Sequence, residues 1–163
     1  MRVGQGWDLH RLEAGRELWI GGVKIDSPVG EVAYSDGDVL LHALIDAVLG
    51  SAALGDIGTH FPPGNPKWKN AASTDLLNRT MTIFHEADYS LVNMDATVIL
   101  EQPKLGPSVE AIRRRLAELL VLPFQSVSVK AKSGEKVGAV GRGEAIEAHC
   151  IVLAEKLDPS VWV

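Results

Sequence analysis

The chain has 163 residues, of which 46% are hydrophobic, so it can bury a core as one compact domain. Its formal net charge of −5 disfavours broad nucleic-acid binding, and its one cysteine, Cys150, excludes an intrachain disulfide and a cysteine-based zinc site within one chain. No stretch approaches the roughly 20 apolar residues of a membrane-spanning helix, and the first residues lack a signal peptide's apolar region. We therefore expect a single domain over residues 1–163 in the cytoplasm, without nucleic-acid or membrane partners.

The N-terminal segment predicts a strand that ends in polar residues. The strand covers Met1–Trp7 and runs directly into Asp8-Leu9-His10. In extended backbone, residues two apart point to the same side, so Asp8 and His10 can converge on one ion. An aspartate and a histidine at this spacing often occur by chance. The pair therefore indicates a metal site only if the chain supplies a third ligand elsewhere.

The stretch Ser35–His42 supplies that ligand. Asp36-Gly37 is a turn pair, and Asp38 stands at the N-cap of a helix predicted to end near Gly50 or Leu54. His42 and Asp46 lie four apart on one helix face, where a carboxylate can orient a metal-binding imidazole. An exposed His–Asp pair is the alternative interpretation. Asp8, His10 and His42 together form a three-ligand set with an open fourth position, which is typical of catalytic zinc.

The other elements interleave strands with helices. Leu18–Ile25 is predicted as a hairpin around Gly21-Gly22, Gly55–Gly58 as a helix end and Phe61–Asn70 as an irregular loop. Further helices are expected at 73–87 and from Ser108, and further strands at 90–101, 127–132 and 145–153. This order predicts an α/β or α+β sandwich with helices packed on one face of a mixed sheet.

One further segment has a composition suited to an anionic ligand. Lys132-Ser133-Gly134-Glu135-Lys136 offers a hydroxyl and two lysines for phosphate, and Glu135 offers oxygen ligands to a hard cation such as magnesium. A charged surface turn is the commoner outcome for such a segment. The Arg113–Arg115 run is interpreted as a solvated helix face.

Taken together, these motifs resemble those of the 2-C-methyl-D-erythritol 2,4-cyclodiphosphate synthase family of the non-mevalonate isoprenoid pathway. The resemblance covers nearly the whole chain. It rests on six segments: Gly4–His10, Ser35–Asp38 with His42, Ala53–Gly58, Pro103-Lys104, Lys130–Lys136 and Gly141–Glu144.

The resemblance implies a sandwich with ferredoxin-like elements that forms a homotrimer, with active sites between adjacent subunits. The implied reaction is that of a phosphorus–oxygen lyase. The 2-phosphate of 4-diphosphocytidyl-2-C-methyl-D-erythritol 2-phosphate attacks the β-phosphorus, CMP leaves and the cyclic diphosphate forms. Zinc is implied at Asp8, His10 and His42, and a second ion, magnesium or manganese, at Glu135.

The resemblance also implies substrate contacts. Tyr34 and Ser133 match catalytic positions, Asp56 and Gly58 match ribose contacts, and Arg142 matches a position near the trimer axis. Leu100–Gly106 and Lys132-Ser133 match a cytidine and phosphate pocket contributed by the neighbouring subunit. The full set of implied substrate-binding residues is Asp8, Leu9, His10, Tyr34, Ser35, Asp56, Ile57, Gly58, Phe61, Leu100, Pro103, Lys104, Leu105, Gly106, Lys132, Ser133, Gly134, Glu135, Ala139 and Arg142.

The chain departs from the family pattern at several of these places. Gln5 and Tyr34 stand where the family usually has histidine, and Ala139 stands where phenylalanine is common. The loop after Phe61 reads Pro62–Asn65 in place of a segment with aspartates. Lys132-Ser133 replaces a frequent threonine pair and keeps one hydroxyl. A tyrosine hydroxyl donates a hydrogen bond but carries no positive charge.

Two other functions use the same residues. A zinc hydrolase would use the three ligands and a metal-bound water, and would give a linear product. A non-catalytic trimeric protein that binds isoprenoid phosphates would bind ligand without turnover.

Overall fold

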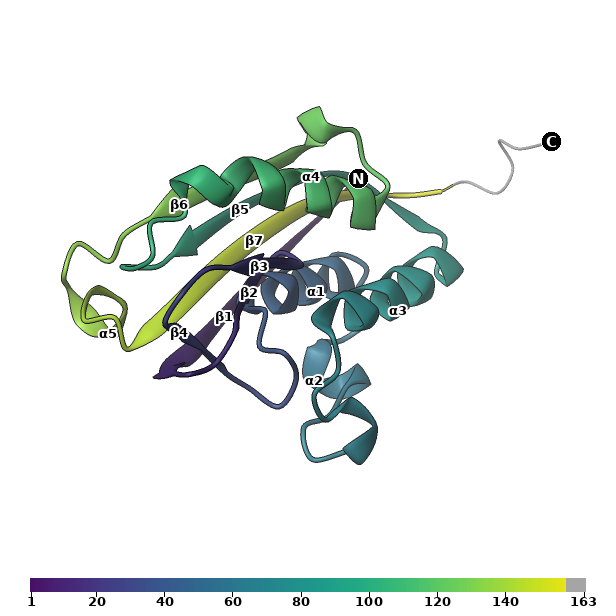
Figure 1. Cartoon of the computed structure of the whole chain (residues 1–163). Helices are drawn as coiled ribbons and strands as arrows, with labels where there is room; N and C mark the ends of the chain where they lie inside the picture. The colour runs from purple at the N-terminus through teal and green to yellow at the C-terminus, as the bar shows by residue number, and fades with distance from the viewer. Residues whose placement is uncertain (158–163) are drawn as a thin grey trace.

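The fold is described from a computed structural model, which describes residues 1–157; the last six residues of the predicted domain, 158–163, lie outside this range. The described residues form seven strands and five α-helices (Figure 1). Four strands come first and three helices follow them, after which strands and helices alternate. Their bounds are β1 Arg2–Ala14, β2 Leu18–Ile20, β3 Val23–Ile25, β4 Val29–Val32, α1 Val39–Ser51, α2 Ile57–His60, α3 Ser73–Glu86, β5 Tyr89–Ile99, α4 Val109–Leu120, β6 Val127–Lys132, α5 Gly138–Gly141 and β7 Ala145–Lys156. Short 3₁₀ turns lie at Pro66–Trp68, Gly106–Ser108 and Phe124–Ser126.

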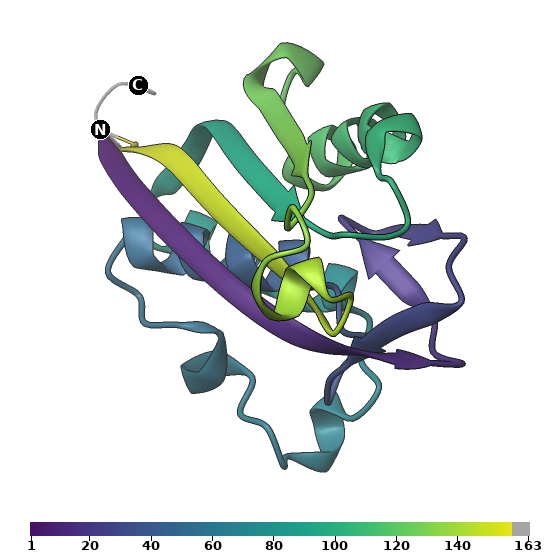
Figure 2. The same ribbon diagram turned by 90° about the vertical axis from the view of Figure 1, so that its left-hand side faces the viewer.

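Five strands form one mixed sheet in the order β4-β1-β7-β5-β6. β5 and β6 are parallel, and every other neighbouring pair in this sheet is antiparallel. Helices α1, α3 and α4 lie together behind the sheet in Figure 2, and the short α5 lies on the opposite side near the end of β7. The predicted mixed sheet with its long helices on one face is therefore confirmed.

Two glycines let α1 lie directly on β1. A Cβ atom added to Gly4 would stand 1.8 Å from the carbonyl oxygen of Ala47, and one added to Gly6 would stand 1.9 Å from that of Ala43. Both distances are far below van der Waals contact, so no larger residue fits. This close approach brings the helix that carries His42 against the strand that carries Asp8.

The start of α1 is fixed by Asp38, as its N-cap position predicts. The buried Asp38 carboxylate accepts the N–H of Leu41 at 3.0 Å and the N–H groups of Gly21 and Gly22 at 2.9 and 2.6 Å. Gly21-Gly22 is the predicted turn of the β2–β3 hairpin, which forms a separate two-stranded sheet. One side chain thus joins the hairpin turn to the first turn of the helix.

The predicted elements are found, with changes at their ends. β1 continues beyond His10 to Ala14 because residues 11–14 pair with β4, a strand that the sequence pattern did not mark. The helix end predicted at Gly55–Gly58 instead opens the short α2, and α5 was also not predicted. Arg113 is only partly solvated, since it donates to the carbonyl of Val127 at 2.8 Å. Cys150 is buried in β7, as expected of a core thiol.

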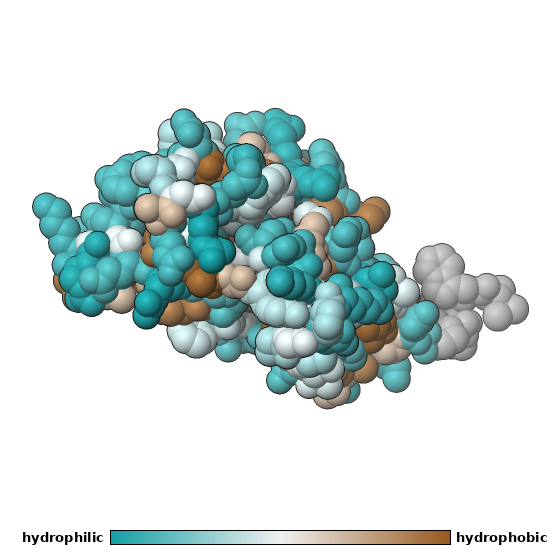
Figure 3. Space-filling model, turned by 60° about the horizontal axis from the view of Figure 1, so that its bottom comes forward, coloured by the Kyte–Doolittle hydropathy of each residue, from teal (hydrophilic) through white to brown (hydrophobic). Residues whose placement is uncertain are grey.

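The surface on the α2 side is mostly hydrophilic and is interrupted by hydrophobic patches (Figure 3). On the sheet side away from α1, an open face carries four apolar side chains that are 42 to 67% exposed, namely Val3, Trp7, Leu9 and Ile151. Within residues 1–157, no helix combines the length and the apolar character needed to cross a membrane.

Candidate metal centre and active site

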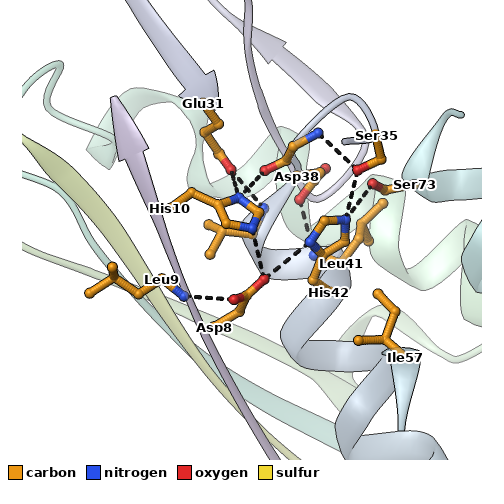
Figure 4. Close-up of polar contacts among 12 residues, drawn as sticks. Asp8, Leu9, His10, Glu31, Ser35, Asp38, Leu41, His42, Ile57 and Ser73 are labelled. Atoms are coloured by element: carbon orange, nitrogen blue, oxygen red, sulfur yellow. Dashed lines mark hydrogen bonds and ion pairs between the residues drawn. The ribbon is translucent and has the colours of Figure 1, made fainter. Parts of the chain in front are cut away.

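Three side chains from β1 and α1 converge as the sequence predicted. The Asp8 Oδ2 atom lies 3.0 Å from His10 Nε2 and 3.1 Å from His42 Nδ1. One ligand atom of each residue lies within 4.8 Å of the other two (Figure 4). His42 is 8% exposed, so the alternative of an exposed His–Asp pair is wrong.

The far nitrogen of His42 is held by two serines. His42 Nε2 lies 3.0 Å from Ser35 Oγ and 3.0 Å from Ser73 Oγ. The Ser73 hydroxyl donates to Asp36, so its oxygen accepts the Nε2–H of His42 and leaves Nδ1 free to bind an ion. The predicted orienting partner, Asp46, instead accepts the N–H of Ile57 at 2.7 Å, and that expectation is wrong.

The far nitrogen of His10 is held in a similar way. His10 Nδ1 lies 2.7 Å from Glu31 Oε2 and 2.7 Å from the carbonyl oxygen of Gly37. Both partners are acceptors, so Nδ1 carries the proton and Nε2 faces Asp8. Sequence reasoning missed Glu31, Asp36 and Ser73, which belong to a strand end, a turn and a helix start. No local pattern in the sequence links these residues to a metal site. Only the fold brings them to the imidazoles.

The electrostatics of the three ligands favour a cation. Burial raises the pKa of Asp8, but its side-chain contacts with His10 and His42 outweigh burial and hold that pKa well below its usual range. Burial lowers the pKa of His10, but hydrogen bonds to Asp8 and Glu31 raise it overall to about 10. Without a metal, His10 is therefore protonated and positively charged. A divalent ion bound by the three ligands would supply positive charge in place of that proton. Two imidazole nitrogens and one carboxylate oxygen are a donor set that fits zinc.

A cavity of about 310 Å³ opens beside the two histidines. Six predicted substrate-binding residues line it, His10, Tyr34, Ser35, Ile57, Gly58 and Phe61. Its other lining residues are His42, Ala33, Pro63, Trp68 and Leu76. Trp68 packs edge-on against Phe61, with ring centroids 5.1 Å apart and planes at 88°. Sequence reasoning did not identify Trp68 as a cavity residue. An aromatic side chain within a proline-rich loop was the one feature of the sequence that could have indicated it.

Two predicted residues near this cavity point elsewhere. The Leu9 side chain lies on the open face, away from the metal ligands (Figure 4). The carboxylate of Asp56 accepts the N–H of Thr59 at 2.7 Å and so begins α2. Neither Leu9 nor Asp56 lines the cavity.

The remaining predicted residues form a second group at one end of the sheet. Because β5 and β6 are parallel and pair Ile99 with Lys132, the segments 100–106 and 132–135 leave the sheet side by side. The Ser133 hydroxyl donates to Glu135, and Leu105 is buried. Ala139 and Arg142 are exposed in and just after α5, and Arg142 pairs with Glu144 at 2.9 Å.

Lys132 of the second group lies far from the first group within one chain. Leu9, Glu147, Ile99 and Lys132 occupy one row across β1, β7, β5 and β6. Lys132 is thus three strand spacings from Leu9, about 14 Å. None of the second group lines the cavity described above.

Comparison with known proteins gives a consistent family. The YgbB family model matches residues 1–155. The 2-C-methyl-D-erythritol 2,4-cyclodiphosphate synthase of Symbiobacterium thermophilum is 50% identical over 153 residues, which are 94% of this chain and 98% of that protein. The solved IspF of Plasmodium falciparum, in complex with CDP, has a TM-score of 0.84 at 31% identity and covers 96% of this chain and 97% of its own.

A longer relative contains the same unit. The bifunctional enzyme IspD/IspF of Erythrobacter litoralis is 46% identical over 158 residues, which are 97% of this chain. The chain spans 41% of the length of that relative. The match to the family model over residues 1–155, together with these relatives, means that the chain belongs to the YgbB family.

Proposed function

We propose that this protein converts 4-diphosphocytidyl-2-C-methyl-D-erythritol 2-phosphate to 2-C-methyl-D-erythritol 2,4-cyclodiphosphate and CMP, as a phosphorus–oxygen lyase of isoprenoid precursor biosynthesis. The observation that carries the proposal is the convergence of Asp8, His10 and His42 beside a cavity. It is supported by relatives that bear the name of this synthase and by the CDP complex of a structural relative.

The reaction needs alignment more than covalent chemistry. An oxygen of the 2-phosphate forms a bond to the β-phosphorus, and the bond from that phosphorus to the CMP oxygen breaks with its electron pair going to CMP. In-line transfer of this kind requires that two anionic groups be held together and their charge neutralised. No nucleophilic side chain is required, which agrees with the burial of Cys150.

Different residues of this chain are proposed to align the two phosphate groups and to neutralise their charge. Asp8, His10 and His42 would hold zinc, which acts when bound as a Lewis acid on a phosphate oxygen. Tyr34 lines the cavity and is proposed to donate a hydrogen bond from its hydroxyl to the reacting phosphate. Ser133 is proposed to donate a hydrogen bond at the diphosphate. Glu135 would hold magnesium or manganese through one carboxylate, a mode in which substrate phosphates and water complete the shell.

A homotrimer with active sites between subunits is part of the proposal. Lys132 lies about three strand spacings from Leu9 within one chain, and a second copy would bring the 132–135 segment of one chain to the metal ligands of another. The open face supplies apolar surface for that contact, since Trp7 is 51% and Ile151 50% exposed. One domain over residues 1–163 and a cytoplasmic location are proposed on composition alone.

The function is tested by phosphorus NMR of the protein with the proposed substrate, zinc and magnesium. We expect signals of CMP and a cyclic diphosphate. CMP with a linear product would instead indicate the zinc hydrolase. Ligand binding without turnover, in a zinc-loaded trimer, would indicate the binding-only alternative.

The His42→Ala variant is the matched control for this experiment. It removes one ligand of an open site and is expected to abolish both zinc binding and turnover while circular dichroism stays native. Normal turnover with one zinc per chain in this variant would contradict the proposed centre.

A further inference from the structure

Glu31 is a buried carboxylate that the proposed reaction does not use. It lies in β4, opposite Leu12 of β1, and is only 3% exposed. Removing a carboxylate from water is costly unless specific contacts compensate it. The position therefore needs a physical reason.

One oxygen of this carboxylate joins two elements of the metal centre. Glu31 Oε2 lies 2.7 Å from His10 Nδ1 and 3.0 Å from the backbone nitrogen of Val39, both of which donate to it. Val39 is the first residue of α1, three residues before His42. The same oxygen thus contacts a ligand on β1 and the start of the helix that carries another ligand (Figure 4).

Helix capping alone does not explain Glu31. Asp38 already caps α1, and its two oxygens together accept three backbone N–H groups. By contrast, Glu31 Oε1 has no hydrogen-bond partner among the described residues. A purely structural carboxylate buried with one oxygen unpaired is unfavourable. The contact with His10 is the feature that distinguishes Glu31 from Asp38.

We propose that Glu31 is a positioning residue of the metal centre, which accepts the Nδ1–H of His10 and so turns the Nε2 lone pair toward the ion. This inference rests on the proposed zinc site at Asp8, His10 and His42. A carboxylate behind a histidine ligand fixes the ring and its tautomer, and removing such a partner typically weakens metal binding about 10- to 100-fold. The carbonyl of Gly37 also accepts this Nδ1–H, at 2.7 Å, so some orientation survives without Glu31.

The test is zinc affinity, measured by competition with a chromogenic chelator. Glu31→Gln keeps the shape and an acceptor oxygen but replaces the carboxylate by an amide, and we expect zinc binding about 10-fold weaker than in the unaltered protein. Glu31→Leu removes the acceptor as well, and we expect a loss of up to about 100-fold. Asp38→Asn is the comparison variant, because it perturbs the helix start through a buried carboxylate that touches neither histidine, and we expect it to weaken zinc binding less than Glu31→Gln does.

Two outcomes would overturn the inference. One is a folded Glu31→Gln variant that binds zinc as tightly as the unaltered protein. The other is an equal loss in Asp38→Asn, which would assign the effect to the helix start. If Glu31→Leu does not fold, the zinc affinity of Glu31→Gln against that of the unaltered protein still tests the inference.

A spectroscopic measurement tests the same inference without relying on affinity. In the zinc-loaded protein labelled with ¹⁵N-histidine, we expect His10 to carry its proton on Nδ1, with a low-field proton signal that moves in Glu31→Gln. A proton on Nε2 would contradict the inference. Failure of the unaltered protein to bind zinc would instead defeat the proposed function, so the two failures are distinguishable.

Discussion

At the scale of single residues, each imidazole of the metal centre has one nitrogen bonded to a protein acceptor and the other turned toward Asp8. Ser73 accepts from His42, and Glu31 and Gly37 accept from His10. The proton on the nitrogen that faces away from Asp8 is therefore held in place in each imidazole before any ion arrives. Such preorganisation lowers the cost of ordering the ligands when the ion binds.

The first prediction concerns the proton that zinc must displace. In the metal-free protein the pKa of His10 is raised to about 10, because hydrogen bonds to Asp8 and Glu31 outweigh burial, whereas Asp8 is already ionised. At pH 7.5 zinc binding should release about one proton from His10, and affinity should rise about tenfold per pH unit until the pH approaches 10. Calorimetry in two buffers of different ionisation enthalpy measures this release. A binding heat independent of buffer would contradict it.

The second prediction concerns Tyr34, which lines the cavity beside the histidines. Tyr34→Phe removes one hydroxyl donor and keeps the ring. We expect turnover to fall about tenfold, which corresponds to one hydrogen bond of about 1.4 kcal/mol, with zinc content unchanged. Steady-state kinetics and zinc analysis on the same sample check both parts. Unchanged turnover would remove Tyr34 from the proposed catalytic residues.

Much of the metal centre was predictable because its ligands follow local rules. The alternation of a strand placed Asp8 and His10 on one side, and the N-cap at Asp38 fixed the helix that presents His42. Their supporting groups were not predictable in this way. Ser73 lies 31 residues from His42, and Glu31 lies 21 residues from His10, so only tertiary packing brings them together.

At the scale of secondary-structure elements, the contact between α1 and β1 sets the geometry of the centre. Gly4 and Gly6 leave no space for a Cβ atom beneath the helix backbone. The sequence marked both residues as part of a strand, but a strand pattern does not reveal which helix crosses it. For a similar reason β4 escaped prediction, since its four residues are recognised as a strand only through pairing with β1.

The third prediction tests that contact. In Gly6→Ala the added methyl group would meet the Ala43 carbonyl oxygen at 1.9 Å, so α1 must move away from β1. We expect the free energy of unfolding to fall by roughly 3 kcal/mol, and zinc binding to weaken because His42 moves with the helix. Gly50→Ala is the matched control, since a Cβ there meets nothing within 4 Å. Urea unfolding of both variants measures the difference, and equal stabilities would contradict the prediction.

At the scale of the whole molecule, one face of the sheet is covered by helices and the other is open. Val3, Trp7, Leu9 and Ile151 lie on the open face, and the row register of β1 and β7 places them on the same side. An exposed apolar surface of this kind is characteristic of a contact between chains. The separation of the two groups of predicted site residues gives such a contact a role in the proposed reaction.

The fourth prediction follows from that role. Ile151→Lys places a charge on the open face, and we expect it to dissociate the proposed trimer and abolish turnover while each chain still binds zinc. Val121→Lys is the control, because Val121 is 88% exposed at the end of α4, away from the sheet. Sedimentation of both variants measures the assembly. A monomeric Ile151→Lys variant with full turnover would show that one chain holds a complete active site.

The place of β7 in the sheet has a consequence for synthesis of the chain. β7 is the last strand along residues 1–157, yet it lies between β1 and β5 and pairs Ala154 with Arg2. On the ribosome, β1 must therefore wait until residues 145–156 are made before its central partner exists. Until then, only part of the sheet is available to cover the apolar surface of α1. We expect nascent chains that end before residue 145 to stay protease-sensitive and to depend on chaperones, and native structure to form only once residues 145–156 are available for pairing.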